Sequence, residues 1–477
     1  MRTLGNLLAF SPELWLLFGA IVIFALARFL AASTTTILAG MTLAIAFLAL
    51  STQFKQTILI LNGAFLLDGF AIVVDVVILG AALLCLLASR ADVLPGELDH
   101  SAVPGFVLLA TLGAMLAVSA NEMIALFVSL ELLAVNLYVL TGLVRRGHGS
   151  IAASLGYLVL GTASSGLLLY GLALVFGLSG QTQLHAVGTA LTNTKPEQAA
   201  IMLAVSLLIG GFAVRIGLVP IRWWTRGFET GVGLRAVTLI QSVGVVAGLA
   251  VFGRLFASGF AGTRIAYPVI IAIVAAVAMT AGNLLALTQS SIRRMLVYAT
   301  VAQAGFALLA FTDLKRVGVS ALVIFLVALA LTTITAFATV IAYTRSVHSD
   351  AIRDLAGMSR WSPGLALALS LSLLSLAGLP PLAGFLGKLL VLQAAVDGGY
   401  AWLVVIAVAN ILIAGLATAR VIRTLFIDQP VFEVIPARLD AGIRVSVVAA
   451  SIGTVFMGLL LAPLYSAAGY AQAALLH

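Results

Sequence analysis

The sequence predicts an all-α integral membrane protein of about 14 transmembrane helices, because apolar runs long enough to cross a bilayer recur along nearly its whole length. Of its residues, 62% are hydrophobic and only 9% are charged, whereas a soluble domain carries about 25% charged residues. Each apolar run must satisfy its own backbone hydrogen bonds in lipid, which favours helices, and a membrane β-barrel would alternate at period two instead.

The order of the helices follows from the apolar runs, which are separated by segments that carry basic residues singly or in pairs. The first run has one arginine before it and no small-residue cleavage site, which indicates a helix and not a signal peptide. The predicted spans are residues 13–31, 35–51, 67–89, 101–120, 122–143, 150–178, 198–220, 233–258, 266–288, 294–311, 317–345, 362–395, 399–426 and 441–469.

The basic residues between these spans are distributed as topology signals are, so the net charge of +8 does not indicate nucleic-acid binding. With an even number of helices, about 14 basic residues fall on one side of the membrane and about six on the other. The positive-inside rule then predicts that both termini lie on the non-cytoplasmic side.

Cysteine and histidine usage argues against a metal or cofactor site on this chain. Cys85 is the only cysteine, which excludes an internal disulfide and a cysteine-ligated iron–sulfur cluster. The five histidines have no metal-ligand spacing, and glycine-rich pieces such as residues 231–233 lack the context of a phosphate-binding loop. We therefore predict neither a metal nor a bound cofactor.

Helix-breaking sequence occurs in two of the predicted spans, at residues 214–220 and 377–388, five helices apart. Each break has a proline and a nearby basic residue, and freed backbone carbonyls are tolerated at membrane depth mainly beside a polar cavity. This pairing predicts two repeats, residues 101–258 (helices 4–8) and 266–427 (helices 9–13), around an internal ion path. Two ordinary proline kinks are the alternative.

Charged residues inside predicted spans are the candidates for a proton path. Glu131 lies in the middle of an apolar helix, where a carboxylate either exchanges protons or hydrogen-bonds to a neighbouring helix. Lys388 follows the second break and either releases a proton at membrane depth or snorkels to the boundary. Arg215 and Arg222 flank Pro220; arginine keeps its proton, so both can bias a carboxylate but cannot relay protons. Polar residues in other helices, Gln303 and Tyr298, either bind water on this path or hydrogen-bond between helices.

Several segments resemble the subunit N family of NADH-quinone oxidoreductase, respiratory complex I, and the similarity covers most of the chain. Residues 130–133 with 137–140 resemble the family's helix 5 and its glutamate, residues 157–171 its helix 6, and residues 282–298 its joint between helices 9 and 10. The segment from Gly378 to Lys388 is the most specific match.

The resemblance implies an inverted-repeat antiporter-like fold with discontinuous helices 7 and 12 and a glutamate–lysine axis that passes protons. It also implies a bacterial inner (plasma) membrane location, other membrane-arm subunits as partners, and redox chemistry with quinone, FMN and iron–sulfur clusters on partner subunits.

Departures from the family pattern concern the titratable groups of this axis. Gly156 stands at the helix 6 lysine position, and Val245 at the helix 8 lysine position. Arg215 replaces the helix 7 lysine, Arg222 a histidine, and Gln303 the helix 10 histidine. Glu131 and Lys388 are kept. These exchanges predict an impaired lysine relay in which Arg215 holds Glu131 ionised.

The leading hypothesis is a membrane-arm subunit of a complex I-type NADH:quinone oxidoreductase that couples quinone reduction to proton translocation, with its own proton path impaired. One alternative is a non-pumping scaffold subunit of the same complex. The other is a subunit of a multisubunit cation/proton antiporter or membrane-bound hydrogenase, because these share the fold.

Overall fold

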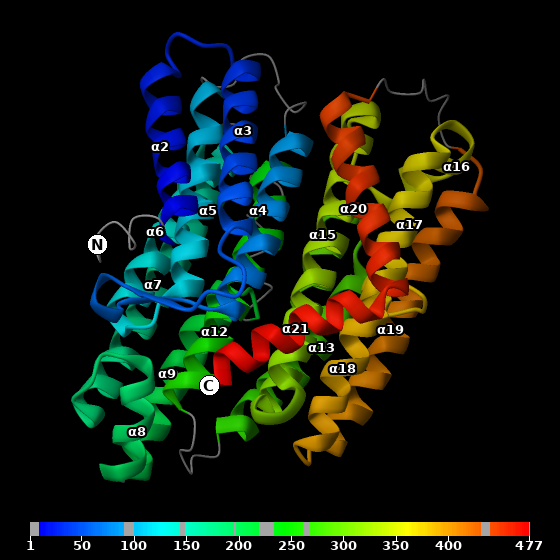
Figure 1. The fold of residues 1–477 in the computed structure, drawn as a ribbon. Helices are drawn as coiled ribbons and strands as arrows, with labels where there is room; N and C mark the ends of the chain where they lie inside the picture. The colour runs from blue at the N-terminus through cyan, green and yellow to red at the C-terminus, as the bar shows by residue number, and fades with distance from the viewer. Residues whose placement is uncertain are drawn as a thin grey trace.

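The computed structural model describes residues 9–89, 100–143, 148–194, 197–218, 233–260, 267–430 and 439–476. Within these ranges the chain is helical apart from one short β-hairpin. Figure 1 shows the helices of the N-terminal and C-terminal halves as two groups, with the last helix running obliquely from the second group toward the first.

The N-terminal half consists mainly of long apolar helices that pack as antiparallel neighbours. A β-hairpin lies between the second and the third of these helices. Its strands, β1 (Ile58–Ile60) and β2 (Phe65–Leu67), are joined by the short turn η1 (Leu61–Gly63). The helices are α2 (Ser11–Leu26), α3 (Ala32–Ser51), α4 (Gly69–Ser89), the short turn η2 (His100–Ala102), α5 (Val103–Ser119), α6 (Met123–Gly142), α7 (His148–Ser179), α8 (Leu184–Thr194) and α9 (Gln198–Arg215).

Three apolar spans lie inside the bundle and are enclosed by the others. In an apolar stretch of 18 residues from each span, all residues of Leu234–Gly259 and 94% of those of Ile292–Thr312 and Val319–Val347 are buried, whereas only 28% are buried in the outer span Ala32–Ser51. The inner spans are made of α11 (Leu234–Leu239), η3 (Ile240–Gly244), α12 (Val245–Arg254), η4 (Leu255–Gly259), α14 (Ile292–Ala307), η5 (Leu308–Thr312) and α15 (Val319–Val347). Any polar side chain on these helices must find its partner within the protein.

The remaining helices of the C-terminal half surround α14 and α15. A helix that the sequence predicts as a single span is broken here into α17 and α18. The elements are α13 (Tyr267–Thr288), the π-helical turn η6 (Leu314–Gly318), η7 (Ile352–Leu355), α16 (Met358–Trp361), α17 (Pro363–Ala377), α18 (Ala383–Asp397), α19 (Ala401–Phe426), α20 (Ala441–Leu459) and α21 (Leu461–Leu476).

The predicted fold class is confirmed, because 11 helices among the described residues are long and apolar enough to cross a membrane. Three further apolar helices, Ser11–Leu26, Val103–Ser119 and Pro363–Ala377, are shorter. The exact count of 14 spans therefore stays a prediction. The break expected near residue 378 is present, between Ala377 and Ala383.

Several predicted boundaries are wrong. The span 441–469 is two helices, because the backbone leaves the helical region at Leu460 and Pro463 then stands in the first turn of α21, where proline is tolerated. The first helix ends at Leu26 and not at residue 31, and α9 ends at Arg215 and not at residue 220. The β-hairpin and the short helix α8 were not predicted, since neither has a long apolar run.

Close helix packing depends on glycines at particular contacts, and this gives a first prediction. A Cβ atom at Gly282 of α13 would lie 2.6 Å from the backbone nitrogen of Ala302 in α14, whereas a Cβ at Gly166 of α7 would meet nothing within 4 Å. Gly282→Val should therefore destabilise the protein by about 1–3 kcal/mol through overpacking. Gly166→Val is the matched control. Thermal unfolding of the purified protein in detergent measures both, and equal midpoints for the two variants would contradict the packing argument.

Candidate functional site

The helix α9 ends at Arg215, where the chain turns out of the helix. Gly217 has a φ of +75°, a conformation that favours glycine, and the Leu218 amide donates a 2.6 Å hydrogen bond back to the Ala213 carbonyl. The helix therefore stops inside the predicted span 198–220, with a basic residue in its last turn. Pro220 and Arg222 lie outside the described residues.

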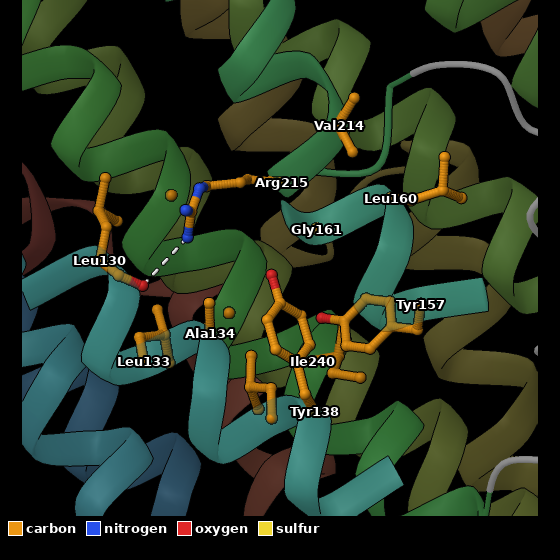
Figure 2. Close-up of a pocket in the computed structure, with 13 residues that line it drawn as sticks. Leu130, Leu133, Ala134, Tyr138, Tyr157, Leu160, Gly161, Val214, Arg215 and Ile240 are labelled. Carbon is orange, nitrogen blue, oxygen red and sulfur yellow. Dashed lines mark hydrogen bonds between the residues drawn. The ribbon is translucent and has the colours of Figure 1, made fainter. Parts of the chain in front are cut away.

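Arg215 joins three helices through its guanidinium group. It forms an ion pair with Glu131 of α6, and its Nη1 donates a 3.0 Å hydrogen bond to the Leu130 carbonyl, drawn in Figure 2. Its Nη2 also donates to the Ser165 hydroxyl of α7 at 2.8 Å. The side chain of Arg215 is 9% exposed and that of Glu131 is 28% exposed. The structure thus brings together the carboxylate and the arginine that the sequence singled out.

A small cavity lies beside this ion pair. Its volume is about 40 Å³, and its walls include Arg215, Tyr138 and Tyr157 among mainly apolar side chains. The two tyrosine rings meet edge to face with their centroids 5.1 Å apart, and Figure 2 shows the Tyr138 hydroxyl pointing toward the Arg215 side of the cavity. Because a water molecule needs roughly 10–15 Å³ of such space and polar partners, this cavity has room for a few waters.

The π-helical turn η3 contacts both this cavity and a second polar contact, between Gln241 and Thr300. Ile240 and Gly244 of the π-helical turn η3 line the cavity. The Oε1 atom of Gln241 instead accepts a 2.8 Å hydrogen bond from the Thr300 hydroxyl of α14. Both partners are buried. Single π-helical turns are frequent at functional sites because they re-aim side chains within a helix.

The second helix break holds Lys388. Gly378, with a φ of +88°, ends α17, and Lys388 from α18 donates hydrogen bonds to the carbonyls of Leu376 at 2.6 Å and Ala377 at 3.2 Å. Its ammonium group also lies 4.2 Å from the centre of the Phe306 ring. Carbonyls at the end of a helix lack intrahelical donors and carry partial negative charge, so they suit a cation. Lys388 is 1% exposed, which shows that the snorkelling alternative is wrong.

Gln303 shares the same break. Its Nε2 donates a 2.8 Å hydrogen bond to the Leu376 carbonyl, so one carbonyl accepts from both Gln303 and Lys388. Gln303 follows Thr300 on α14 by about one turn, which places the Gln241–Thr300 pair and the Lys388 site on neighbouring turns of one helix.

Three of the predicted positions remain, and they differ in burial and in contacts. Tyr298 is buried on α14 and has an interaction partner. Val245 is buried in the apolar core, so the axis has no titratable group there. Gly156 is exposed on α7, and a side chain at that position would meet open space.

Sequence reasoning missed other polar residues. Gln241 and Thr300 carry no charge, and nothing in the sequence pairs them. Buried charges were missed as well, namely Glu13, Asp68, Asp75, Arg254 and Arg293. Asp68 and Asp75 stand inside the predicted span 67–89 and Arg254 inside 233–258, so the criterion applied to Glu131 would have found them.

Comparison with known proteins gives consistent matches. The family model for the transmembrane region of NADH:quinone oxidoreductase and Mrp antiporter matches residues 120–414. NADH-quinone oxidoreductase subunit N of Methylobacterium nodulans is 31% identical over 469 residues, covering 97% of each chain. NAD(P)H-quinone oxidoreductase subunit 2 of Synechocystis sp. is 33% identical over 419 residues, covering 85% of this chain and 80% of that protein.

Solved structures of related complexes also match. A chain of respiratory complex I from Thermus thermophilus with bound aureothin superposes with a TM-score of 0.81 at 27% identity, covering 95% of this chain and 98% of that one. A chain of the archaeal membrane-bound sulfane sulfur reductase superposes with a TM-score of 0.88 at 21% identity, covering 99% and 98%. A chain of the Mrp complex from Dietzia sp. gives 0.86 at 20% identity, covering 98% and 97%. The last two show a shared fold.

The Glu131–Arg215 pair gives a second prediction. Arg215→Gln should cost about 2–3 kcal/mol of stability, because it leaves a mostly buried carboxylate without its cation. The double variant Glu131→Gln/Arg215→Gln should cost less than the sum of the two single variants, since it removes both charges. The measurement is a double-mutant cycle of unfolding in detergent.

The pair of Arg423 and Asp428, at 72% and 39% exposure, is the matched control for this cycle. Exposed ion pairs contribute about 0–1 kcal/mol, so the corresponding cycle should show little coupling. Strict additivity at Glu131 and Arg215 would show that their ion pair does not stabilise the fold.

Proposed function

Since the chain belongs to the NADH:quinone oxidoreductase/Mrp antiporter transmembrane family, we propose that it is a membrane-arm subunit of a complex I-type NADH:quinone oxidoreductase that couples quinone reduction to proton translocation. The observation that carries this proposal is the match to subunit N of Methylobacterium nodulans over 97% of both chains. The protein is thus a part of a translocating enzyme complex and has other membrane-arm subunits as partners.

The redox steps belong to partner subunits in this proposal. Quinone, FMN and iron–sulfur clusters are expected there, because a cysteine-ligated cluster needs several thiolates and this chain has only Cys85. The proposed location is the bacterial inner membrane, and the excess of basic loop residues on one side supports an orientation with both termini on the non-cytoplasmic side.

The two antiporter-like repeats that we propose, residues 101–258 and 266–427, divide the polar contacts between them. Glu131 and Arg215 fall in the first, and Gln303 and Lys388 in the second. An inverted repeat places equivalent broken helices on opposite sides of one axis. The ends of α9 and α17 support this arrangement, because a basic side chain takes part in the contacts at each.

We propose that proton transfer through the first repeat is impaired. Arginine does not release its proton, so Arg215 cannot pass one on. Val245 is buried and offers no titratable group at its position on α12. Lys388 retains an amine that can exchange a proton, so the second repeat keeps a group that the first has lost.

A second candidate function is a non-pumping scaffold subunit of the same complex. The observation that favours it is the replacement of titratable positions by Arg215 and Val245 within an intact fold. The Mrp complex and the sulfane sulfur reductase share this fold, so membership in a cation/proton antiporter or another respiratory membrane complex is a third reading.

Copurification tests the assembly. An affinity-tagged copy of this chain, solubilised from its own cells in mild detergent, should bring down subunits that contain flavin and iron–sulfur clusters. Mass spectrometry identifies these subunits, and visible absorbance and electron paramagnetic resonance detect the cofactors. Recovery of other antiporter-like subunits without flavin or clusters would support the antiporter reading instead.

Lys388→Ala tests the proton path. If the path through this chain is impaired, the variant complex in proteoliposomes should keep its quinone reductase rate and the wild-type ratio of protons moved per electron. Gln303→Leu is the control, because it also removes a donor to the Leu376 carbonyl without removing a titratable group. Loss of pumping in Lys388→Ala alone, with electron transfer and assembly intact, would mean that this chain conducts protons.

A further inference from the structure

A group of buried charges lies outside the contacts described so far, between α2, α4 and α12. Asp68 stands directly before α4, and its Oδ1 accepts hydrogen bonds from Nη2 of Arg254 at 2.6 Å and from the Ala71 amide at 2.8 Å. Both side chains of the ion pair are 1% exposed. Arg254 also lies over the Phe70 ring, 5.3 Å from its centre. Asp68 and Arg254 thus neutralise each other.

Two further carboxyl groups at this place have no cation of their own among the residues that the structure describes. Asp75 is 0% exposed, and neither of its carboxyl oxygens has a hydrogen-bond partner. Glu13 is 5% exposed, and its Oε2 also lacks a partner. The charged groups that act on Asp75 are Glu13, Arg254 and Asp68. Three acidic groups therefore face one guanidinium group, which is already paired.

Other charges near these helices do not compensate the excess. The helices α3 and α5, which pack against α2, carry no charged residue. On the helices packed against α4, Arg345 of α15 and Arg444 of α20 are exposed. Arg235 of α11 lines a different cavity together with Cys85, ten positions further along α4 than Asp75. The titratable side chains of α21 are tyrosines, of which Tyr470 borders Gly69.

Burial of a carboxylate without a cation or a hydrogen-bond donor is strongly unfavourable, and a second buried carboxylate that acts on it adds repulsion. Protonation removes the charge and supplies the missing donor. Among the described residues, no group of three or more His, Cys, Asp and Glu side chains could hold a metal ion. We propose that Glu13 and Asp75 form a proton-binding site in which Asp75, with both carboxyl oxygens buried and without a donor, holds a proton at neutral pH.

This site is separate from the central contacts. Arg254 follows Gln241 by 13 positions (254 − 241), about 20 Å along a helix, and residues 243–253 between them are all apolar or glycine. Glu13 lies in the first turn of α2 and Asp68 directly before α4. The proton-binding site is therefore independent of whether the central axis conducts.

Infrared spectroscopy tests for the bound proton directly. The difference spectrum at neutral pH between the wild-type complex and its Glu13→Gln/Asp75→Asn variant should contain the carbonyl stretch of a protonated carboxylic acid, shifted in D₂O. Asp428→Asn is the control, since Asp428 is 39% exposed and paired with Arg423, and its difference spectrum should contain only carboxylate bands. The absence of the acid band from the first spectrum overturns the proposal.

A matched pair of variants on α4 gives an independent readout. Asp75→Asn exchanges a neutral acid for a neutral amide, so the amount of assembled complex in membranes should stay at the wild-type level. Asp68→Asn keeps a capping oxygen for the Ala71 amide but leaves Arg254 buried without an anion, so assembly should be largely lost. A loss of assembly in Asp75→Asn as large as in Asp68→Asn would show that Asp75 is charged, and would overturn the proposal even if the double variant cannot be purified.

Discussion

The free carbonyl groups at the end of α17 impose the constraint on which the arrangement of this protein depends. Lipid offers no hydrogen-bond donors, so a helix that stops at membrane depth must find donors within the protein. Lys388 and Gln303 supply them, from α18 and α14. In the last turn of α17, the hydroxyl of Ser375 forms a hydrogen bond with the hydroxyl of Thr332 in α15. The same hydroxyl accepts a hydrogen bond from the Gly384 amide. The break thus fixes the positions of four helices relative to one another.

The end of α9 meets a similar requirement with a different cation. The planar guanidinium of Arg215 reaches Glu131, the Leu130 carbonyl and the Ser165 hydroxyl at once, which a lysine ammonium does less well because it is a compact point charge. Arg215 therefore holds a structural junction between α6, α7 and α9 together. An arginine does not release its proton, so the same side chain that makes this junction cannot act as a proton relay.

Buried charge is handled in three ways in this chain. Arg254 is matched by a carboxylate, and Lys388 is matched by helix-end carbonyls and an aromatic ring. Glu13 and Asp75 have no cation between them, and the bound proton that we infer completes the pattern. In each case the low dielectric of the membrane interior raises the cost of an uncompensated charge, so the partner is as much a part of the fold as the apolar packing around it.

The sequence by itself determined the helical membrane class, most spans, the break between α17 and α18, and the presence of Glu131, Arg215 and Lys388 within long apolar segments. These follow from local composition, because a bilayer demands long apolar helices and makes each interruption conspicuous. Only the tertiary structure decided that Gln241 meets Thr300, that Lys388 binds carbonyls twelve and eleven residues before it, and that Asp68, 186 positions from Arg254, pairs with it. The physical reason is that hydropathy registers the cost of a buried polar group, whereas its partner comes from another helix, whose position depends on packing that no single span encodes.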